Sequence, residues 1–168
     1  MSHPTAYHQL GRFIVDFQHL EYALTELLVL LDDSDSMAVL ILANELAYNQ
    51  KLRTADILFS RFVDLRKNTD ASSKAAFHEL MGEFGKLGER RNELVHSHYS
   101  NWINIEGRVG LLRSNSRLRA KKGELEELEE KLQPEAFDGD LQRLARAATA
   151  LERFRLQVID WLYPPDGT

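Results

Sequence analysis

Residues 6–31 read AYHQLGRFIVDFQHLEYALTELLVLL, and this stretch decides the fold. Its apolar side chains recur every three or four residues, which is the spacing of one face of an α-helix. They are Leu10, Phe13, Ile14, Phe17, Leu20, Leu24, Leu27, Leu28 and Leu31. The pattern predicts one long helix that turns this face toward the core. The Asp and Ser residues that follow are typical of a helix end and of a cap for the next helix.

The same helical spacing returns in four later stretches. Residues 37–48 are almost wholly apolar and predict a short, well-buried helix. Residues 52–63 and 77–99 predict two further helices, the second of which ends close to residue 99. Residues 141–162 predict a final long helix.

The pattern changes between the last two of these helices. Residues 101–121 alternate in polarity around Gly107, which predicts a small β-hairpin or meander. Residues 124–133 predict a charged helix that Pro134 ends. Short connections favour antiparallel neighbours. We therefore expect an all-α fold: one domain of residues 1–168, an up-and-down bundle of four to six helices, with a β insert at about 101–121.

Composition narrows the class of protein. The chain has 168 residues, a formal net charge of −5 and no cysteine. The negative charge argues against a protein that coats nucleic acid by bulk attraction. The lack of cysteine excludes disulfides and thiolate chemistry, and it fits a reducing compartment. The sequence opens without a signal-peptide pattern, and its longest apolar run is too short to span a bilayer. We therefore expect a cytoplasmic protein without a membrane partner.

The residues with chemical potential are concentrated in residues 89–99, ERRNELVHSHY. Successive helical residues rotate by about 100°, so Asn92 and His96 are neighbours one turn apart on a polar stripe. Arg91 falls among apolar residues of the same helix, where a charged side chain needs a partner or an interface. An arginine, an amide and an imidazole grouped in this way can grip a phosphate and move a proton.

Two carboxylates are placed as unusually as Arg91. Glu21 lies in the apolar stripe of the first helix, and Asp56 lies beside apolar residues of the third. Because an unpaired buried charge is costly, we expect Glu21 or Asp56 to meet Arg91 inside or between bundles. The alternative is that these residues lie at helix edges, in surface ion pairs of small value.

Gly82, Gly85 and Gly88 recur every three residues on the helix that carries the cluster. Each costs a helix about 1 kcal/mol relative to alanine, which suggests that another element packs closely against this face. We expect a second helix there, with another subunit as one source. The alternative is a locally bent segment.

Residues 91–96, RNELVH, resemble the Arg-Asn-x-x-x-His signature of HEPN domains. These are small helical bundles common in toxin–antitoxin, phage-defence and RNA-processing systems. The helix with Glu21 is also similar to the first helix of some members. The resemblance implies a metal-independent endoribonuclease without a cofactor, with Arg91, Asn92 and His96 of two subunits facing each other and Glu21 as a supporting residue.

RNA carries its own nucleophile, the 2′-OH, so the implied reaction needs only proton transfer and charge stabilisation. His96 is expected as base or acid, Arg91 as the phosphate ligand, and Asn92 as a group that orients His96 or the phosphate. Arg90 is a second candidate for the phosphate. Tyr99 lies one residue later than the tyrosine that a toxin subgroup modifies, so that modification is not carried over.

A basic run follows the motif, made of Arg108, Arg113, Arg117, Arg119, Lys121 and Lys122. Arg113, Arg117 and Arg119 are candidate RNA-binding residues of an arm beside the active site. Equally open is a solvated hairpin whose charge the acidic residues 124–130 neutralise.

The expected partners are RNA, a second copy of the chain, and an antitoxin or another regulatory protein. Two other functions stay open, a non-catalytic helical binding module of the same fold and a bundle that senses a nucleotide without cleaving RNA. The spacing of His96 and His98 does not predict a metal site, because no third ligand follows at a telling distance.

Overall fold

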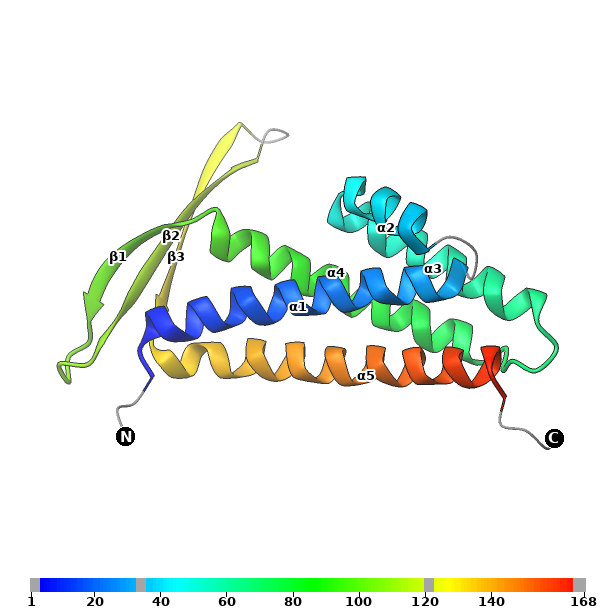
Figure 1. The fold of residues 1–168 in the computed structure, drawn as a ribbon. Helices are drawn as coiled ribbons and strands as arrows, with labels where there is room; N and C mark the ends of the chain where they lie inside the picture. The colour runs from blue at the N-terminus through cyan, green and yellow to red at the C-terminus, as the bar shows by residue number, and fades with distance from the viewer. Residues whose placement is uncertain (1–3, 33–35, 120–122, 165–168) are drawn as a thin grey trace.

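Four helices open the chain in the order that the sequence predicts (Figure 1). They are α1 (Ala6–Asp32), α2 (Ser36–Glu45), α3 (Tyr48–Leu65) and α4 (Ser73–Val95). A short 3-10 helix, η1 (Pro134–Phe137), leads into the last helix, α5 (Asp138–Leu162). This computed structural model describes residues 4–32, 36–119 and 123–164, apart from the side chains of residues 36, 117–119 and 124.

The core forms around α1, whose apolar stripe is buried as its spacing predicts. Aromatic rings from three helices close one end of this core. Phe59 of α3 stacks on Phe77 of α4 with ring centroids 4.2 Å apart. Phe154 of α5 meets both rings edge-on, at 5.3 and 5.1 Å. Burying each such ring stabilises the fold by about 1.5–3 kcal/mol, so these contacts tie α3, α4 and α5 together.

The helices do not form a simple up-and-down bundle. Figure 1 shows α3 and α4 as an antiparallel pair, but α1 and α5 lie along each other and run in the same direction. The reason is the segment between α4 and α5, which begins and ends at the same end of the helices. It lets α5 start beside the start of α1.

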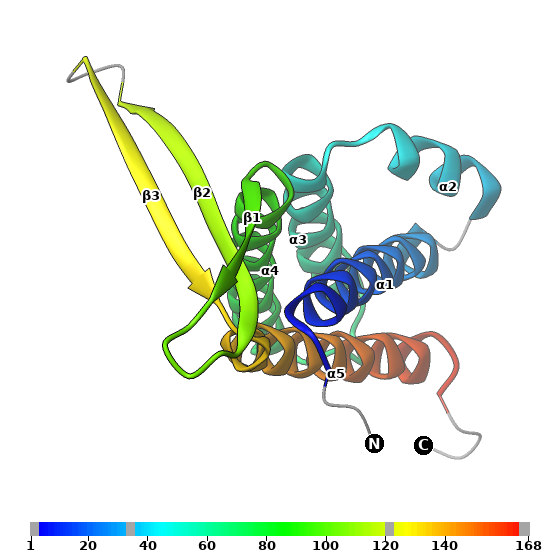
Figure 2. The ribbon, with the colours of Figure 1, turned by 90° about the vertical axis from the view of Figure 1, so that its left-hand side faces the viewer.

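That segment is a three-stranded antiparallel sheet, so the fold is a mixed helical and β arrangement and the all-α expectation is wrong. The strands are β1 (His98–Ile103), β2 (Val109–Arg119) and β3 (Glu124–Leu132), in the order β1-β2-β3. The expected insert at about 101–121 is too short at both ends. Figure 2 shows β2 and β3 projecting well beyond the helices as a long hairpin.

β3 stands where residues 124–133 predict a charged helix. The leucines of this stretch are three and four residues apart, and its glutamates favour helices, so its local pattern is helical. β2 offers this stretch a partner of opposite charge, however. The register places Arg113 opposite Glu130 and Arg117 opposite Glu126. Cross-strand pairs of opposite charge stabilise a sheet, and here this long-range pairing outweighs local helix propensity.

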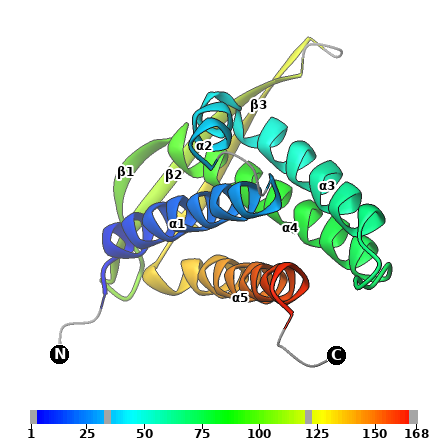
Figure 3. The ribbon, with the colours of Figure 1, turned by 45° about the vertical axis from the view of Figure 1, so that its right-hand side comes forward.

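α2 is apolar on nearly all sides, yet it is not the buried helix that its composition predicts. Met37, Ile41 and Leu42 are 62%, 58% and 67% exposed. Ala43 alone is buried among the α2 side chains that are described. The reason is that α2 rests on α1 from one side only, away from α5 (Figure 3). In the described ranges of the chain, no helix combines the length and apolar character needed to cross a membrane.

The glycine row of α4 faces α3 of the same chain. A Cβ on Gly88 would lie 2.5 Å from a ring carbon of Tyr48, and one on Gly85 would lie 4.0 Å from Leu52. A Cβ on Gly82 would meet nothing within 4 Å. The expected second helix is therefore α3, and the close approach requires glycine only at position 88.

We expect Gly88→Ala to destabilise the protein by about 1–3 kcal/mol, because the ring beneath it cannot withdraw. Tyr48 donates its hydroxyl to the Phe84 carbonyl oxygen at 2.9 Å, and its ring centroid lies 5.1 Å from that of Phe17. Gly82→Ala is the matched control and should stabilise by about 1 kcal/mol through helix propensity. Urea denaturation measures both changes. Equal shifts for the two variants would contradict this packing.

Candidate functional site

The Arg-Asn-x-x-x-His motif occupies the last turn of α4, where the chain leaves the helix for β1. α4 ends at Val95, and His96 adopts φ −99° and ψ 28°. The backbone N–H of His96 still donates to the Asn92 carbonyl oxygen at 3.0 Å. His96 is thus the residue at which helix becomes strand, and its imidazole is exposed.

Two side chains after the motif satisfy the last carbonyls of α4. The Ser97 hydroxyl donates to the Glu93 carbonyl oxygen. The Tyr99 hydroxyl donates to the Leu94 carbonyl oxygen at 2.7 Å. Burial raises the pKa of Tyr99, which keeps this donor protonated. Tyr99 therefore fixes the direction in which β1 leaves the helix, which is a positioning role.

Arg91 lies half-buried against α1. Its Cζ lies 5.9 Å from the ring centroid of Phe17, and its Nη1 donates to Oδ1 of Asn92 at 3.0 Å. The Nε of Arg91 is buried without a hydrogen-bond partner among the described residues. The amide of Asn92 thus orients the guanidinium of Arg91, whereas the sequence left open whether it orients the imidazole or a phosphate.

His96 borders a groove of about 380 Å³ between the end of α4 and the sheet. His98 from β1, Ser114 from β2, and Glu127 and Glu129 from β3 also line it. Imidazoles and carboxylates in one groove can exchange protons with a bound molecule. The two glutamates oppose the binding of a phosphate in this groove.

Arg90, next in the chain to Arg91, is held by two carboxylates from other elements. Its Nε donates to Asp140 of α5 at 2.8 Å, and its two terminal nitrogens donate to the two oxygens of Glu130 of β3 at 2.9 Å each. Burial by itself lowers the pKa of Arg90, but these hydrogen bonds outweigh it and raise the pKa. Arg90 therefore joins α4, β3 and α5, and it has no free edge for a phosphate.

Arg113 belongs to the same network. It is 6% exposed, and its Nε donates to Glu130 at 2.8 Å. Its Nη1 donates to Ser97 at 3.1 Å and to the Glu93 carbonyl oxygen at 3.3 Å. Burial opposes the charge of Glu130, but the hydrogen bonds from Arg90 and the charges of both arginines hold its pKa below the usual value. We call Arg90, Arg113, Glu130 and Asp140 the junction network.

Of the three arginines expected to bind RNA, the structure describes the side chain of Arg113 alone. Arg113 faces the helices inside the junction network rather than solvent. Arg117 and Arg119 lie in β2, but their side chains fall outside the described residues.

Glu21 and Asp56 both find partners other than Arg91. Glu21 accepts a hydrogen bond from Lys51 of α3 at 3.0 Å, and Lys51 is 5% exposed. Asp56 lies 2.6 Å from Nδ1 of His78, and this hydrogen bond raises the pKa of His78. The expected pairing of either carboxylate with Arg91 inside one bundle is therefore wrong. Glu21 joins α1 to α3 through this contact with Lys51.

The sequence reasoning did not predict the junction network, although the sequence contains one indication of it. Glu130 lies in the segment that predicts a charged helix, and Asp140 lies just before the predicted last helix. Matching the alternating arginines of residues 113–119 to the glutamates of 124–130 as two strands would have found the Arg113–Glu130 pair. Nothing local marks Asp140 as a partner of Arg90, fifty residues earlier in the chain.

In the parts of the chain that the structure describes, no group of three or more His, Asp or Glu side chains could hold a metal ion. Comparisons with protein-family models, with curated proteins and with solved structures find no match to this chain.

Replacing Glu130 tests the junction network. Glu130→Ala leaves Arg90 and Arg113 close together without their shared carboxylate, so we expect a loss of about 2–3 kcal/mol in the free energy of unfolding. Fully buried pairs lose about 3–5 kcal/mol, and the 33% exposure of the Glu130 side chain reduces the effect. Glu129→Ala, on the opposite face of β3, is the control and should change stability by less than about 0.5 kcal/mol.

The difference in the free energy of unfolding between the wild type and Glu130→Ala depends on pH, because the pKa of Glu130 is lowered in the folded protein. A carboxylate with a depressed folded pKa stabilises the protein above its unfolded pKa of about 4.3, and this stabilisation is lost as pH falls through the folded value. Urea denaturation of the wild type and Glu130→Ala should therefore converge on acidification. A difference that stays constant with pH would contradict the ion-pair account.

Proposed function

We propose that this chain is a HEPN-like, metal-independent endoribonuclease that works as a homodimer. The observation that carries the proposal is the arrangement at the end of α4. Asn92 holds the guanidinium of Arg91 at 3.0 Å, and the imidazole of His96 is exposed one turn further on. A cation fixed by an amide and an exposed imidazole, both at the end of one helix, are the groups that phosphodiester cleavage through the 2′-OH requires.

In the proposed reaction, His96 takes the proton of an RNA 2′-OH. The 2′ oxygen then forms a bond to the adjacent phosphorus, and the bond from phosphorus to the 5′ oxygen breaks. A second imidazole gives its proton to that leaving oxygen. The products are a 2′,3′-cyclic phosphate and a 5′-OH. Arg91 stabilises the charge that develops on the non-bridging phosphate oxygens.

The reason for proposing a dimer is the resemblance to HEPN domains, in which two motifs face each other, since His98 shares its groove with Glu127 and Glu129, which disfavour a phosphate there. One chain brings one Arg91 and one His96, and a two-fold contact between the ends of two α4 helices would bring both pairs together. Such a contact would also offer a partner for the buried Nε of Arg91. Arg90 takes no part in this chemistry, because Glu130 and Asp140 occupy its donors.

In this proposal the protein acts in the cytoplasm as a toxin or phage-defence effector, and an antitoxin or another regulatory protein restrains it. A second candidate function is a non-catalytic binding or nucleotide-sensing module of the same fold. The non-catalytic binding module finds support in the groove beside His96, where Glu127 and Glu129 disfavour a phosphate-bearing ligand such as RNA.

We expect the purified protein to cleave RNA in the presence of EDTA and to leave 2′,3′-cyclic phosphate ends. His96→Ala should reduce the cleavage rate at least about 100-fold, the usual share of an acid–base group. His19→Ala removes an exposed imidazole of α1 and serves as the matched control, with an unchanged rate. Gel analysis of a 5′-labelled RNA, beside the same RNA methylated on its 2′ oxygens, measures all of these.

Equal cleavage by the wild type and His96→Ala would rule out the assigned role of His96. A wild type that binds a nucleotide but leaves RNA intact would favour the sensing module.

A further inference from the structure

A second group of polar side chains lines a groove of about 280 Å³ between α3 and α4, the antiparallel pair of Figure 1. Asn49, Arg53 and Asp56 border it from α3, because residues four and three apart share one face of a helix. Across the groove, α4 contributes His78 and Gly82. The groove thus brings a guanidinium, an amide, a carboxylate and an imidazole together from two helices.

The cations of this groove are available to a ligand, whereas its carboxylate is not. Arg53 is exposed, and it forms no ion pair or hydrogen bond with the described residues. Asp56 is the one carboxylate among the described lining residues, and its Oδ2 lies 2.6 Å from Nδ1 of His78. This hydrogen bond and the charges of Asp56 and Glu79 raise the pKa of His78, which favours the imidazolium. Glu79 itself does not line the groove. Nε2 of His78 has no partner in the described part of the chain, so it can donate to an anion beside Arg53.

Gly82 gives the groove an open stretch of backbone. It lies inside α4, where glycine costs about 1 kcal/mol relative to alanine, and a Cβ there would meet nothing within 4 Å. Packing within the chain therefore does not require this glycine. Glycine lets a backbone approach a ligand closely, and the buried Leu52 and Met81 give the groove an apolar floor. An uncharged organic group thus has room beside the two cationic side chains.

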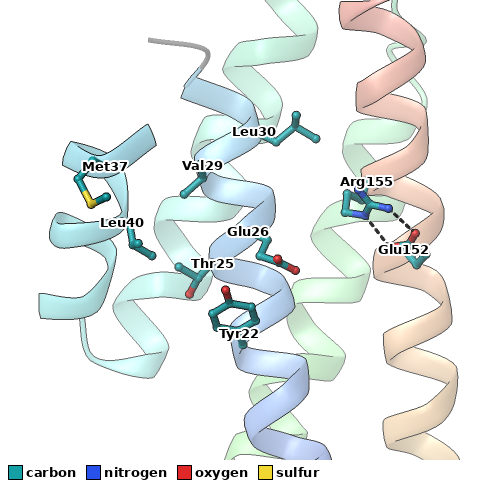
Figure 4. Close-up of a pocket in the computed structure, with 9 residues that line it drawn as sticks. All are labelled: Tyr22, Thr25, Glu26, Val29, Leu30, Met37, Leu40, Glu152 and Arg155. Carbon is teal, nitrogen blue, oxygen red and sulfur yellow. Dashed lines mark hydrogen bonds and ion pairs between the residues drawn. The ribbon is translucent and has the colours of Figure 1, made fainter. Parts of the chain in front are cut away.

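The larger groove over α1, between α2 and α5, differs in its charges (Figure 4). Its volume is about 660 Å³, and Arg155 is the one cation among the described residues that line it. Both oxygens of Glu152 accept hydrogen bonds from Arg155 at 2.7 Å each, and the charge of Glu26 also acts on it. The cation of that groove is therefore already paired, whereas Arg53 is not.

We propose that the α3–α4 groove is a phosphate-binding site, separate from the Arg91–His96 motif. The planar guanidinium of Arg53 is suited to two oxygens of a phosphate, and Nε2 of His78 donates to a third. The organic part of the phosphate ester lies over Gly82. The volume is just below the range of small-ligand sites, about 300–1,000 Å³, so the groove holds a phosphate with one substituent about as large as a nucleoside.

The phosphate belongs either to a small ester or to an RNA strand, which share this chemistry. The proposal does not depend on RNA cleavage, because no residue of the motif lines the groove.

Titration of the full-length chain with adenosine monophosphate, followed by NMR spectra of the backbone amides, tests the small ester. Adenosine, which lacks the phosphate, is the matched ligand. If a small ester is bound, adenosine monophosphate should bind at least about 10-fold more tightly than adenosine. Arg53→Gln should remove this difference, because it removes the charged donor. Arg61→Gln, the same change at another exposed arginine of α3, should alter the affinity by less than about 2-fold.

Fluorescence anisotropy with a 12-nucleotide RNA, methylated on its 2′ oxygens so that it cannot be cleaved, tests the other source. If RNA supplies the phosphate, Arg53→Gln should weaken RNA binding at least about 10-fold and Arg61→Gln less than about 2-fold. If a small ester supplies it, the two variants should bind RNA equally.

Gly82→Ala separates a binding role of the groove from a folding role. It should stabilise the protein and yet weaken the bound probe at least about 3-fold, because its methyl group fills the groove. Equal effects of Arg53→Gln and Arg61→Gln on both adenosine monophosphate and RNA would overturn the proposal. Unchanged binding by Gly82→Ala would overturn the placement of the ligand over α4.

Discussion

The structure depends on one guanidinium. Arg90 donates to Asp140 at 2.8 Å and to both oxygens of Glu130 at 2.9 Å, so a single side chain joins the end of α4, the last strand and the start of α5. Arg113 shares Glu130 and reaches back to Ser97 and the Glu93 carbonyl oxygen. Burying such a network costs desolvation free energy, and removing one member leaves the other charges buried without a partner. The network therefore fixes the relative positions of the elements that it joins. Together with the hydrogen bond from Tyr99 to the Leu94 carbonyl oxygen, it sets the direction in which the chain leaves α4 at His96.

The adjacent residues Arg90 and Arg91 consequently contact different parts of the fold. Successive helical residues point about 100° apart, so Arg90 faces the sheet and α5 while Arg91 faces Phe17 of α1. Asn92 then holds Arg91, and His96 remains exposed beyond them. The structural Arg90 and the residues proposed to react, Arg91 and His96, thus lie within the seven residues 90–96. In the proposed enzyme, the junction network sets the position of the imidazole, and Arg91 and His96 perform the chemistry.

Periodicity predicted the helices well, because α1, α3, α4 and α5 each bury an apolar stripe that is visible in the residues themselves. It failed for β3, where the local pattern is helical and the arginines of β2 decide the outcome. It also failed for ion pairs: a helical wheel shows that Glu21 needs a cation, but the partner is Lys51, thirty residues away on α3. The burial of α2 was overestimated because composition does not reveal whether a second layer covers a helix. At the candidate site, the sequence predicts the residues of the motif, whereas the different contacts of Arg90 and Arg91 required the fold.

That division is the central claim, and thermal unfolding of Arg90→Lys beside Arg91→Lys tests it most directly. Lysine keeps the charge but loses the planar fork, so it cannot hold Glu130 and Asp140 together. We expect Arg90→Lys to lower the stability by about 2 kcal/mol, which corresponds to a fall of about 4–8 °C in Tm for a chain of this size. Arg91→Lys should change Tm by less than about 2 °C. A larger fall for Arg91→Lys than for Arg90→Lys would contradict the account.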